Sequence, residues 1–149
     1  MNILATKLSV IEEQWAEDCK IDRFNLVSES QRSPLLHSKY SKLLNEERKI
    51  LIAMIRDFKR TKLEARQFMI NPTANNPKGF LSKIPKGQRI IKSDYDSMID
   101  GDESVSQEEA KVSLQKAKVE YIESILWQIK DRRAIIYNMI SLLKFESGE

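Results

Sequence analysis

Apolar side chains recur along residues 34–70 at the spacing of one helix face. Ser33 before this segment is a typical N-cap, Pro34 suits the first helical position, and Pro72 disfavours helical geometry in the residue before it. The pattern therefore predicts one long helix over about residues 34–70. At ~100° per residue its apolar stripe contains Leu36, Tyr40, Leu43, Leu51, Met54, Phe58, Ala65 and Met69.

A second periodic segment predicts a long helix over about residues 106–146. Ser106 and Glu109 have the spacing of a capping box, and Gly148 follows the last periodic residue. The second half of this helix is apolar on nearly every side, so it needs more than one packing partner. A large uncovered apolar surface is unusual on a monomer, and we therefore predict self-association. The predicted subunit contacts are Ile125, Trp127, Ile129, Ile136, Met139, Ile140 and Leu143.

The remaining segments give weaker signals. In residues 1–32, Ser9 with Glu12 forms a plausible capping box, and Asp22 is a candidate cap for a second short helix. Residues 71–104 contain three prolines and no sustained period, which predicts a flexible, irregular arm, basic first and acidic afterwards. We expect an all-α fold with one helical domain over residues 1–149, assembled into a homo-oligomer.

Charge changes this picture, because the net charge of +3 hides a strong segregation. Residues 34–92 contain 14 basic and four acidic side chains, whereas residues 93–110 contain seven acidic and no basic ones. A basic run followed by an acidic run is typical of a polyanion-binding protein with an acidic counterweight. The alternative interpretation is a solvated helix face followed by an acidic loop.

The basic residues of the first long helix form a ridge away from its apolar stripe. Lys42, Lys49, Arg56 and Arg60 fall within roughly 40° of one another. Phe80, which lies among the lysines of the arm, is a candidate for stacking on a base. The residues predicted to contact nucleic acid are Lys49, Arg56, Lys59, Arg60, Lys62, Arg66, Lys83, Lys86 and Arg89.

The sequence offers little for catalysis or for a cofactor. His37 is the only histidine, which excludes a multi-histidine metal site and most histidine-activated nucleophiles. The carboxylates of residues 94–103 lack the ligand spacing of a calcium loop. Walker-type loops, nucleophile elbows and dinucleotide fingerprints are missing from the sequence, as is a membrane-spanning apolar run. We expect a binding protein without enzymatic activity, cofactor, metal or membrane contact, and the lone Cys19 fits a reducing cytosol.

A row of Lys and Arg without a base-reading motif contacts phosphates and reads little sequence. If one subunit neutralises about four phosphates of a single strand, log K falls with log salt at a slope of roughly −3 per subunit. Several subunits that hold the same strand gain affinity through effective concentration. A ring therefore explains the basic ridge and the surplus apolar surface together.

Five short motifs resemble those of the UvsY family, the recombination mediators of T-even-type phages. They span nearly the whole chain and are weak only over residues 72–103. In order they are KIDRFNLVSES from Lys20, LHSKYSK from Leu36, LEAR from Leu63, IKDRR from Ile129 and FESGE from Phe145.

The resemblance implies an all-helical, non-enzymatic protein that forms a hexamer or heptamer in the cytoplasm of an infected bacterial host. It implies binding to single-stranded DNA, to a RecA-like phage recombinase and to the phage single-stranded-DNA-binding protein. It also implies that the protein helps the recombinase to displace the single-stranded-DNA-binding protein. In that family, basic residues near the end of the first long helix contribute to DNA binding. Arg66 matches one of them, whereas Glu64 stands where the family's LKAR pattern has lysine; Lys59, Arg60 or Lys62 are candidates to replace that charge.

A second hypothesis belongs to a different class. The chain would be a structural helical scaffold whose basic ridge binds an acidic protein partner. Its own segment of residues 94–103 is one candidate for that partner.

Overall fold

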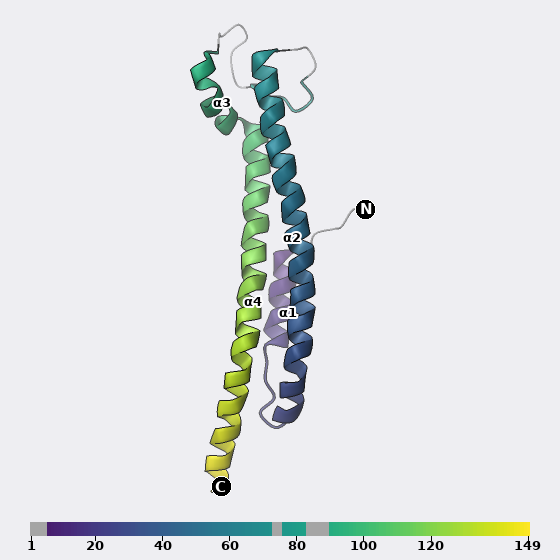
Figure 1. Ribbon diagram of the computed structural model, residues 1–149, viewed down its shortest axis with the longest axis vertical. Coiled ribbons are helices and arrows are strands. Elements are labelled where there is room, and N and C mark those ends of the chain that lie inside the picture. Colours follow the sequence, from purple (N-terminus) through teal and green to yellow (C-terminus); the bar gives the residue numbers. More distant parts are fainter. Residues whose placement is uncertain (1–5, 73–75, 83–89) are drawn as a thin grey trace. The chain divides into compact units, whose positions relative to one another are not determined.

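The structure is a computed structural model, and it describes residues 6–72, 76–82 and 90–149. Regular secondary structure in these residues is entirely helical, which confirms the predicted all-α class (Figure 1). The elements are α1 (Leu8–Asp18), α2 (Leu26–Ile70), the 3₁₀ helix η1 (Lys92–Asp94), α3 (Tyr95–Gly101) and α4 (Glu103–Ser147).

Helix α2 begins at Leu26, eight residues before the predicted start, so Pro34 lies inside it. A proline inside a helix removes one backbone hydrogen bond. Contacts on the preceding turns hold the helix together: Leu26 is buried, and Glu29 forms an ion pair with the buried Arg132 of α4. The expected second short helix is thus the first turn of α2, and tertiary contacts outweigh the local signal at Pro34.

Two predicted capping boxes are wrong. Helix α4 begins at Glu103, and Asp102 caps it by accepting hydrogen bonds from the backbone N–H groups of Ser104 (2.9 Å) and Val105 (3.3 Å). Ser106 lies inside the helix instead. Helix α1 has Lys7 at its N-cap without a side-chain capping bond, so Ser9 also lies inside its helix.

The central segment has more structure than the predicted irregular arm. Residues 92–101 form η1 and α3. In residues 76–82, the Asn76 side chain accepts a hydrogen bond from the Phe80 N–H (3.0 Å) and donates one to the Phe80 carbonyl (2.8 Å). The Leu81 N–H donates to the Asp102 carboxylate (3.0 Å). This short loop is therefore tied to the start of α4.

Contacts divide the chain into two compact units, and each is described by itself. Unit 1 comprises Met1–Arg48 and Ala117–Glu149, and unit 2 comprises Lys49–Lys116. Helices α2 and α4 each contribute residues to both units. One domain over residues 1–149 stays a prediction.

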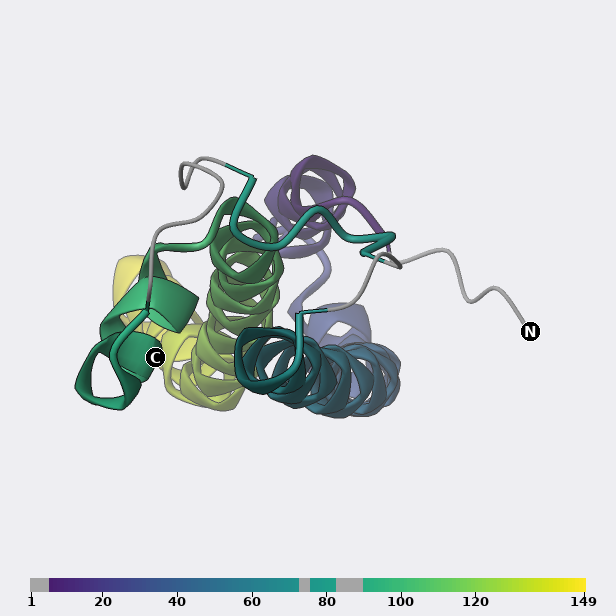
Figure 2. The same ribbon diagram turned by 90° about the horizontal axis from the view of Figure 1, so that it is seen from above.

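Unit 1 is built from α1, the first half of α2 and the second half of α4, and α1 lies beside the other two (Figures 1 and 2). The Trp15 ring packs edge-on against Tyr40 at 5.4 Å between centroids, and its indole N–H donates to Gln128 (3.2 Å). Apolar residues of all three helices form the core, including Ile11, Leu36, Leu44, Ile122, Ile125, Ile129 and Ile136.

Polar and charged groups surround Arg132 of α4 at one edge of this core. Its guanidinium pairs with Glu29 and donates hydrogen bonds to the Ser33 hydroxyl (3.2 Å) and the Cys19 carbonyl (3.2 Å). Burial lowers the pKa of Arg132, and the neighbouring Glu29 carboxylate opposes that effect. A buried charge with this many partners fixes the α1–α2 connection against α4.

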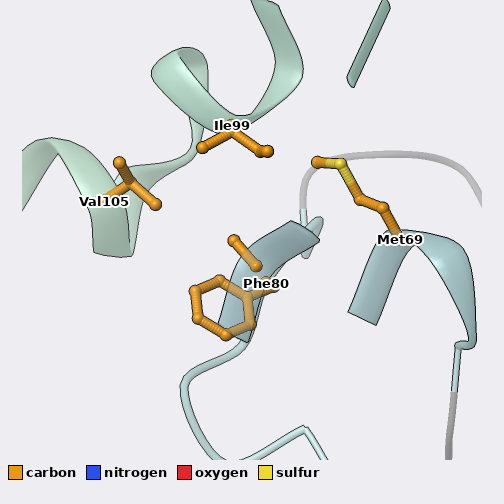
Figure 3. Packing of buried hydrophobic residues seen from close by; sticks show 5 residues of the cluster. Met69, Phe80, Ile99 and Val105 are labelled. Atoms are coloured by element: carbon orange, nitrogen blue, oxygen red, sulfur yellow. The ribbon is translucent and has the colours of Figure 1, made fainter. Parts of the chain in front are cut away.

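Unit 2 has its own small core, drawn in Figure 3. Met69 of α2, Phe80 of the loop, Ile99 of α3 and Val105 of α4 are buried together with Ala65. The side chains come from four segments and turn toward one another. This cluster places α3 beside the last turns of α2.

Candidate nucleic-acid interface

The predicted cations of α2 lie in unit 2 and fall into two rows. At ~100° per residue, Lys49, Arg56 and Arg60 lie within roughly 40° of one another, opposite the buried face of the helix; we name them the outer row. Lys59, Lys62 and Arg66 lie on one flank of that row, within roughly 60° of one another, and form the α3-side row. The single ridge predicted from the sequence therefore has two parts.

The outer row is open to solvent. Arg60 and Arg56 approach the exposed Asp57 carboxylate at 3.9 and 4.0 Å, both at the limit of an ion pair. Lys49 has no ion-pair partner in the part of the chain that the structure describes. Exposed pairs of this kind contribute about 0–1 kcal/mol, so these cations are available to an external anion.

The α3-side row faces acidic residues. Lys62 Nζ lies 3.4 Å from Asp100, and Arg66 Nη1 lies 3.2 Å from Asp96. Lys59 has no such partner among residues 6–72, 76–82 and 90–149. Two of the predicted DNA contacts are therefore already in contact with carboxylates of the chain itself.

Lys78, which is not among the nine predicted contacts, joins the interface from the loop. Its Nζ lies 2.6 Å from Glu64 and donates to the Thr61 hydroxyl at 3.2 Å. Glu64 is the residue at which the resemblance implies a lysine, and Lys78 supplies a positive charge beside it. No helical period reveals this pairing, because the two residues are 14 positions apart with the end of α2 between them.

Other predicted positions do not add to the interface. Lys83, Lys86 and Arg89 lie outside the described residues. The Phe80 ring is buried in the unit 2 core, with its centroid 6.4 Å from that of the Phe68 ring, so this candidate for stacking on a base is not exposed to one. Its spacing among lysines suggested an exposed arm, whereas the loop turns the ring inward.

The predicted subunit contacts of α4 also separate into two groups. Ile125, Ile129 and Ile136 are buried in the core of unit 1, where they pack against their own chain. Trp127, Ile140 and Leu143 are exposed, and Met139 is half-buried. Every residue from 141 to 149 is exposed, and the exposed set also includes Tyr137, Leu142 and Phe145.

Within the described ranges, no group of three or more His, Cys, Asp or Glu side chains is arranged to hold a metal ion. None of the helices in these ranges combines the length and the apolar character that crossing a membrane requires.

Comparisons with known proteins identify the family and the fold of the chain. The sequence pattern of a family described as "Recombination, repair and ssDNA binding protein UvsY" matches residues 14–149. No curated protein sequence matches the chain.

Crystal structures of the bacteriophage T4 recombination mediator protein UvsY share the fold. The lattice type IV structure gives a TM-score of 0.74 at 18% identity and covers 95% of this chain and 99% of that chain. The lattice type II structure gives 0.74 at 19% identity, covering 95% and 98%. The lattice type I structure gives 0.70 at 19% identity, covering 91% and 97%.

Proposed function

The chain belongs to the UvsY family of recombination, repair and single-stranded-DNA-binding proteins, and on that premise we propose that it is a non-enzymatic recombination mediator. It loads a RecA-like phage recombinase onto single-stranded DNA that the phage single-stranded-DNA-binding protein covers. It acts in the cytoplasm of an infected bacterial host. The observation that carries the proposal is the pair of cation rows on α2 in unit 2.

The outer row suits the phosphates of a single strand. Its three cations are exposed and spaced one or two helical turns apart, and the exposed Asp57 is their one ion-pair partner among the described residues. Lys and Arg on one helix face bind the backbone and read no base edges, so binding is independent of sequence. The affinity then depends on salt, because each neutralised phosphate releases counterions.

Assembly turns this modest contact into a firm one. The exposed apolar residues of α4, such as Trp127, Tyr137 and Phe145, join subunits into a hexamer or heptamer. Each subunit then holds part of the same strand at a high effective concentration. The assembly captures and bends the strand, which weakens the grip of the single-stranded-DNA-binding protein and gives the recombinase an organised strand on which to nucleate.

Binding of a fluorescent oligonucleotide across a salt series tests the proposal. For the unaltered protein we expect log K to fall with log salt at a slope of about −3 per subunit. The triple variant Lys49→Ala/Arg56→Ala/Arg60→Ala should bind about tenfold or more weakly at low salt and show a shallower slope.

The matched control removes three positive charges from exposed lysines outside α2 and outside residues 137–149, in the variant Lys7→Ala/Lys111→Ala/Lys116→Ala. It should stay within about threefold of the unaltered protein, since only long-range charge has changed. Affinity that ignores salt, or an equal loss in both triple variants, contradicts the proposed interface.

One observation favours the scaffold hypothesis as a second candidate. The α3-side row already binds an acidic segment of its own chain, through Lys62–Asp100 and Arg66–Asp96. If these pairs serve assembly, their removal should reduce the size of the species in solution. If the chain is a mediator, assembly should persist and strand binding should change.

A further inference from the structure

The position of α3 is fixed by apolar contacts and not by its charges. Ile99 is buried in the core of unit 2, and Tyr95 and Met98 pack against the same cluster. Figure 3 shows the Ile99 side chain directed toward Met69 and Phe80. Asp96 directly follows Tyr95, and Asp100 directly follows Ile99. These apolar contacts therefore hold both carboxylates beside α2, although their ion pairs are exposed.

The two acidic residues and the two cations are in register. Asp96 and Asp100 are four residues apart on α3, and Arg66 and Lys62 are four residues apart on α2, so each pair spans about one helical turn of ~5.4 Å. Arg66 meets Asp96 and Lys62 meets Asp100, which means that the two segments run antiparallel. Neighbouring phosphates along one DNA strand have a similar separation. The carboxylates therefore present two negative charges as a strand would.

All four side chains remain within reach of solvent. The exposed fractions are 43% for Lys62 and 47% for Arg66, and they are 86% for Asp96 and 68% for Asp100. These residues line an open hollow of about 400 Å³ together with Leu63 and Ile99. An anion that enters this hollow can replace the carboxylates by side-chain rotation, while Ile99 keeps the helix in place.

We propose that Lys62 and Arg66 form a site for two successive phosphates of single-stranded DNA, and that Asp96 and Asp100 are its built-in competing ligand. This inference rests on the proposed function, because it identifies the external anion as the DNA strand. The acidic helix imitates the strand and occupies the site until DNA displaces its carboxylates.

The competition has two physical consequences. Exposed ion pairs between a carboxylate and a cation are weak, so a DNA strand that the outer row already holds nearby can displace Asp96 and Asp100. A small anion free in solution lacks this local concentration and is repelled by the two carboxylates. Each displaced carboxylate then attracts a cation from solution, which offsets part of the counterion release that drives binding. The competitor therefore lowers both the affinity for DNA and the salt dependence of binding.

The double variant Asp96→Asn/Asp100→Asn tests the inference, with an oligo(dT) of about 20 nucleotides as the probe. The variant keeps side-chain size and removes the competing charge. We expect affinity to rise about threefold to tenfold at low salt. The slope of log K against log salt should become steeper by about one per subunit.

The matched control is Asp94→Asn/Glu109→Gln, which also removes two negative charges. Both residues are exposed, and neither has an ion pair in the described part of unit 2. Its affinity should rise by less than about twofold, since it changes only the screened long-range field. When Asp96→Asn/Asp100→Asn is combined with Lys62→Ala/Arg66→Ala, it should not raise the affinity for DNA, because the cations that it would free are missing.

The outcomes separate this inference from the proposed function. If the unaltered protein binds the strand with strong salt dependence and the asparagine pair gains no more than its control, the competing-ligand inference is overturned and the mediator proposal stands. If neither protein binds, both fall. If the asparagine pair loses assembly instead of gaining affinity, the acidic helix serves the scaffold and the inference is overturned.

Discussion

Asp18, at the end of α1, contacts three side chains of α2 through a single carboxylate. It accepts hydrogen bonds from Lys39 (2.6 Å) and Tyr40 (2.9 Å) and lies 3.3 Å from Arg32. Burial on its own would raise the pKa of Asp18, but the hydrogen bonds and the charges of Lys39 and Arg32 outweigh burial and lower it below the ordinary value of 3.8. The end of α1 is thereby tied to α2 by the charged form of Asp18.

The lowered pKa sets the pH dependence of stability. Because the pKa of Asp18 is lower in the folded than in the unfolded chain, its contribution is complete above the ordinary value and is lost as the pH falls through the folded value. Asp18→Asn should reduce the free energy of unfolding by about 2 kcal/mol at pH 7 and flatten its decline below about pH 4. Urea unfolding between pH 3 and 7 measures both effects.

Asp94→Asn is the control for this prediction, since it removes an exposed carboxylate on η1. It should change the free energy of unfolding by less than about 0.5 kcal/mol throughout the same pH range. An Asp18→Asn variant with the same acid-limb slope as the unaltered protein contradicts the account of this network.

At the level of residues, the sequence reveals which groups are cationic but not which ones already have partners. Helical spacing correctly places Lys49, Arg56 and Arg60 on one exposed face. It does not reveal that Arg66 meets Asp96, because that contact joins residues 30 positions apart. The N-cap at Asp102 is missed for the same reason. Ser106 has equally suitable local spacing, and Asp102 differs from it by accepting a hydrogen bond from the Leu81 N–H, which is distant in the sequence.

Among the elements, α3 owes its existence to packing more than to its own sequence. A seven-residue helix is too short to show a reliable period, and isolated helices of this length are unstable in water. Contacts of Ile99 with the unit 2 core supply the stability that local propensity lacks. This explains why residues 92–101 read as part of an irregular arm.

Removing the Ile99 anchor should therefore loosen α3. We expect Ile99→Ala to lower the free energy of unfolding by about 2–4 kcal/mol, through lost burial and a cavity. Amide hydrogen exchange should accelerate most in residues 95–101. Leu114→Ala is the matched control, because Leu114 is an exposed leucine of α4.

The control should change the unfolding free energy by less than about 0.5 kcal/mol and leave exchange in α3 unaltered. Equal exchange rates in α3 for both variants would show that its position does not depend on the core contact.

The long helices are the elements that periodicity predicts best. The end of α2 at Ile70 and the span of α4 are within a few residues of the predicted bounds. The start of α2 is missed because Pro34 and Ser33 form a strong local start signal. Glu29 and Leu26 override it through contacts with α4 and burial, which no local pattern contains.

For the whole molecule, the central claim is that uncovered apolar surface on α4 gathers subunits and that the gathered cation rows hold one strand. Residues 141–149 are all exposed, and Tyr137 and Phe145 are 69% and 81% exposed. Substitutions there test assembly without disturbing the core. Ile136 is unsuitable for this purpose because it is buried in unit 1.

The sequence anticipated this surplus but assigned it too broadly. The heavily apolar second half of α4 predicts more than one packing surface, and apolar residues do remain exposed on it beside the buried ones. Which residues belong to which surface depends on where α1 and α2 lie, and Ile125 and Ile129 face those helices while Trp127 does not. Self-association therefore stays a prediction for the exposed group alone.

Absolute mass in solution, measured by light scattering with and without a short oligonucleotide, tests the central claim most directly. We expect a species of six or seven 17.4 kDa subunits that binds the strand, and a single subunit with at least tenfold weaker binding in Tyr137→Asp/Phe145→Asp. Glu109→Ala/Glu120→Ala, at two exposed positions of α4 outside residues 137–149, should retain the large species. An unaltered protein that remains one 17.4 kDa subunit at micromolar concentration, and ignores the oligonucleotide at low salt, would contradict the account.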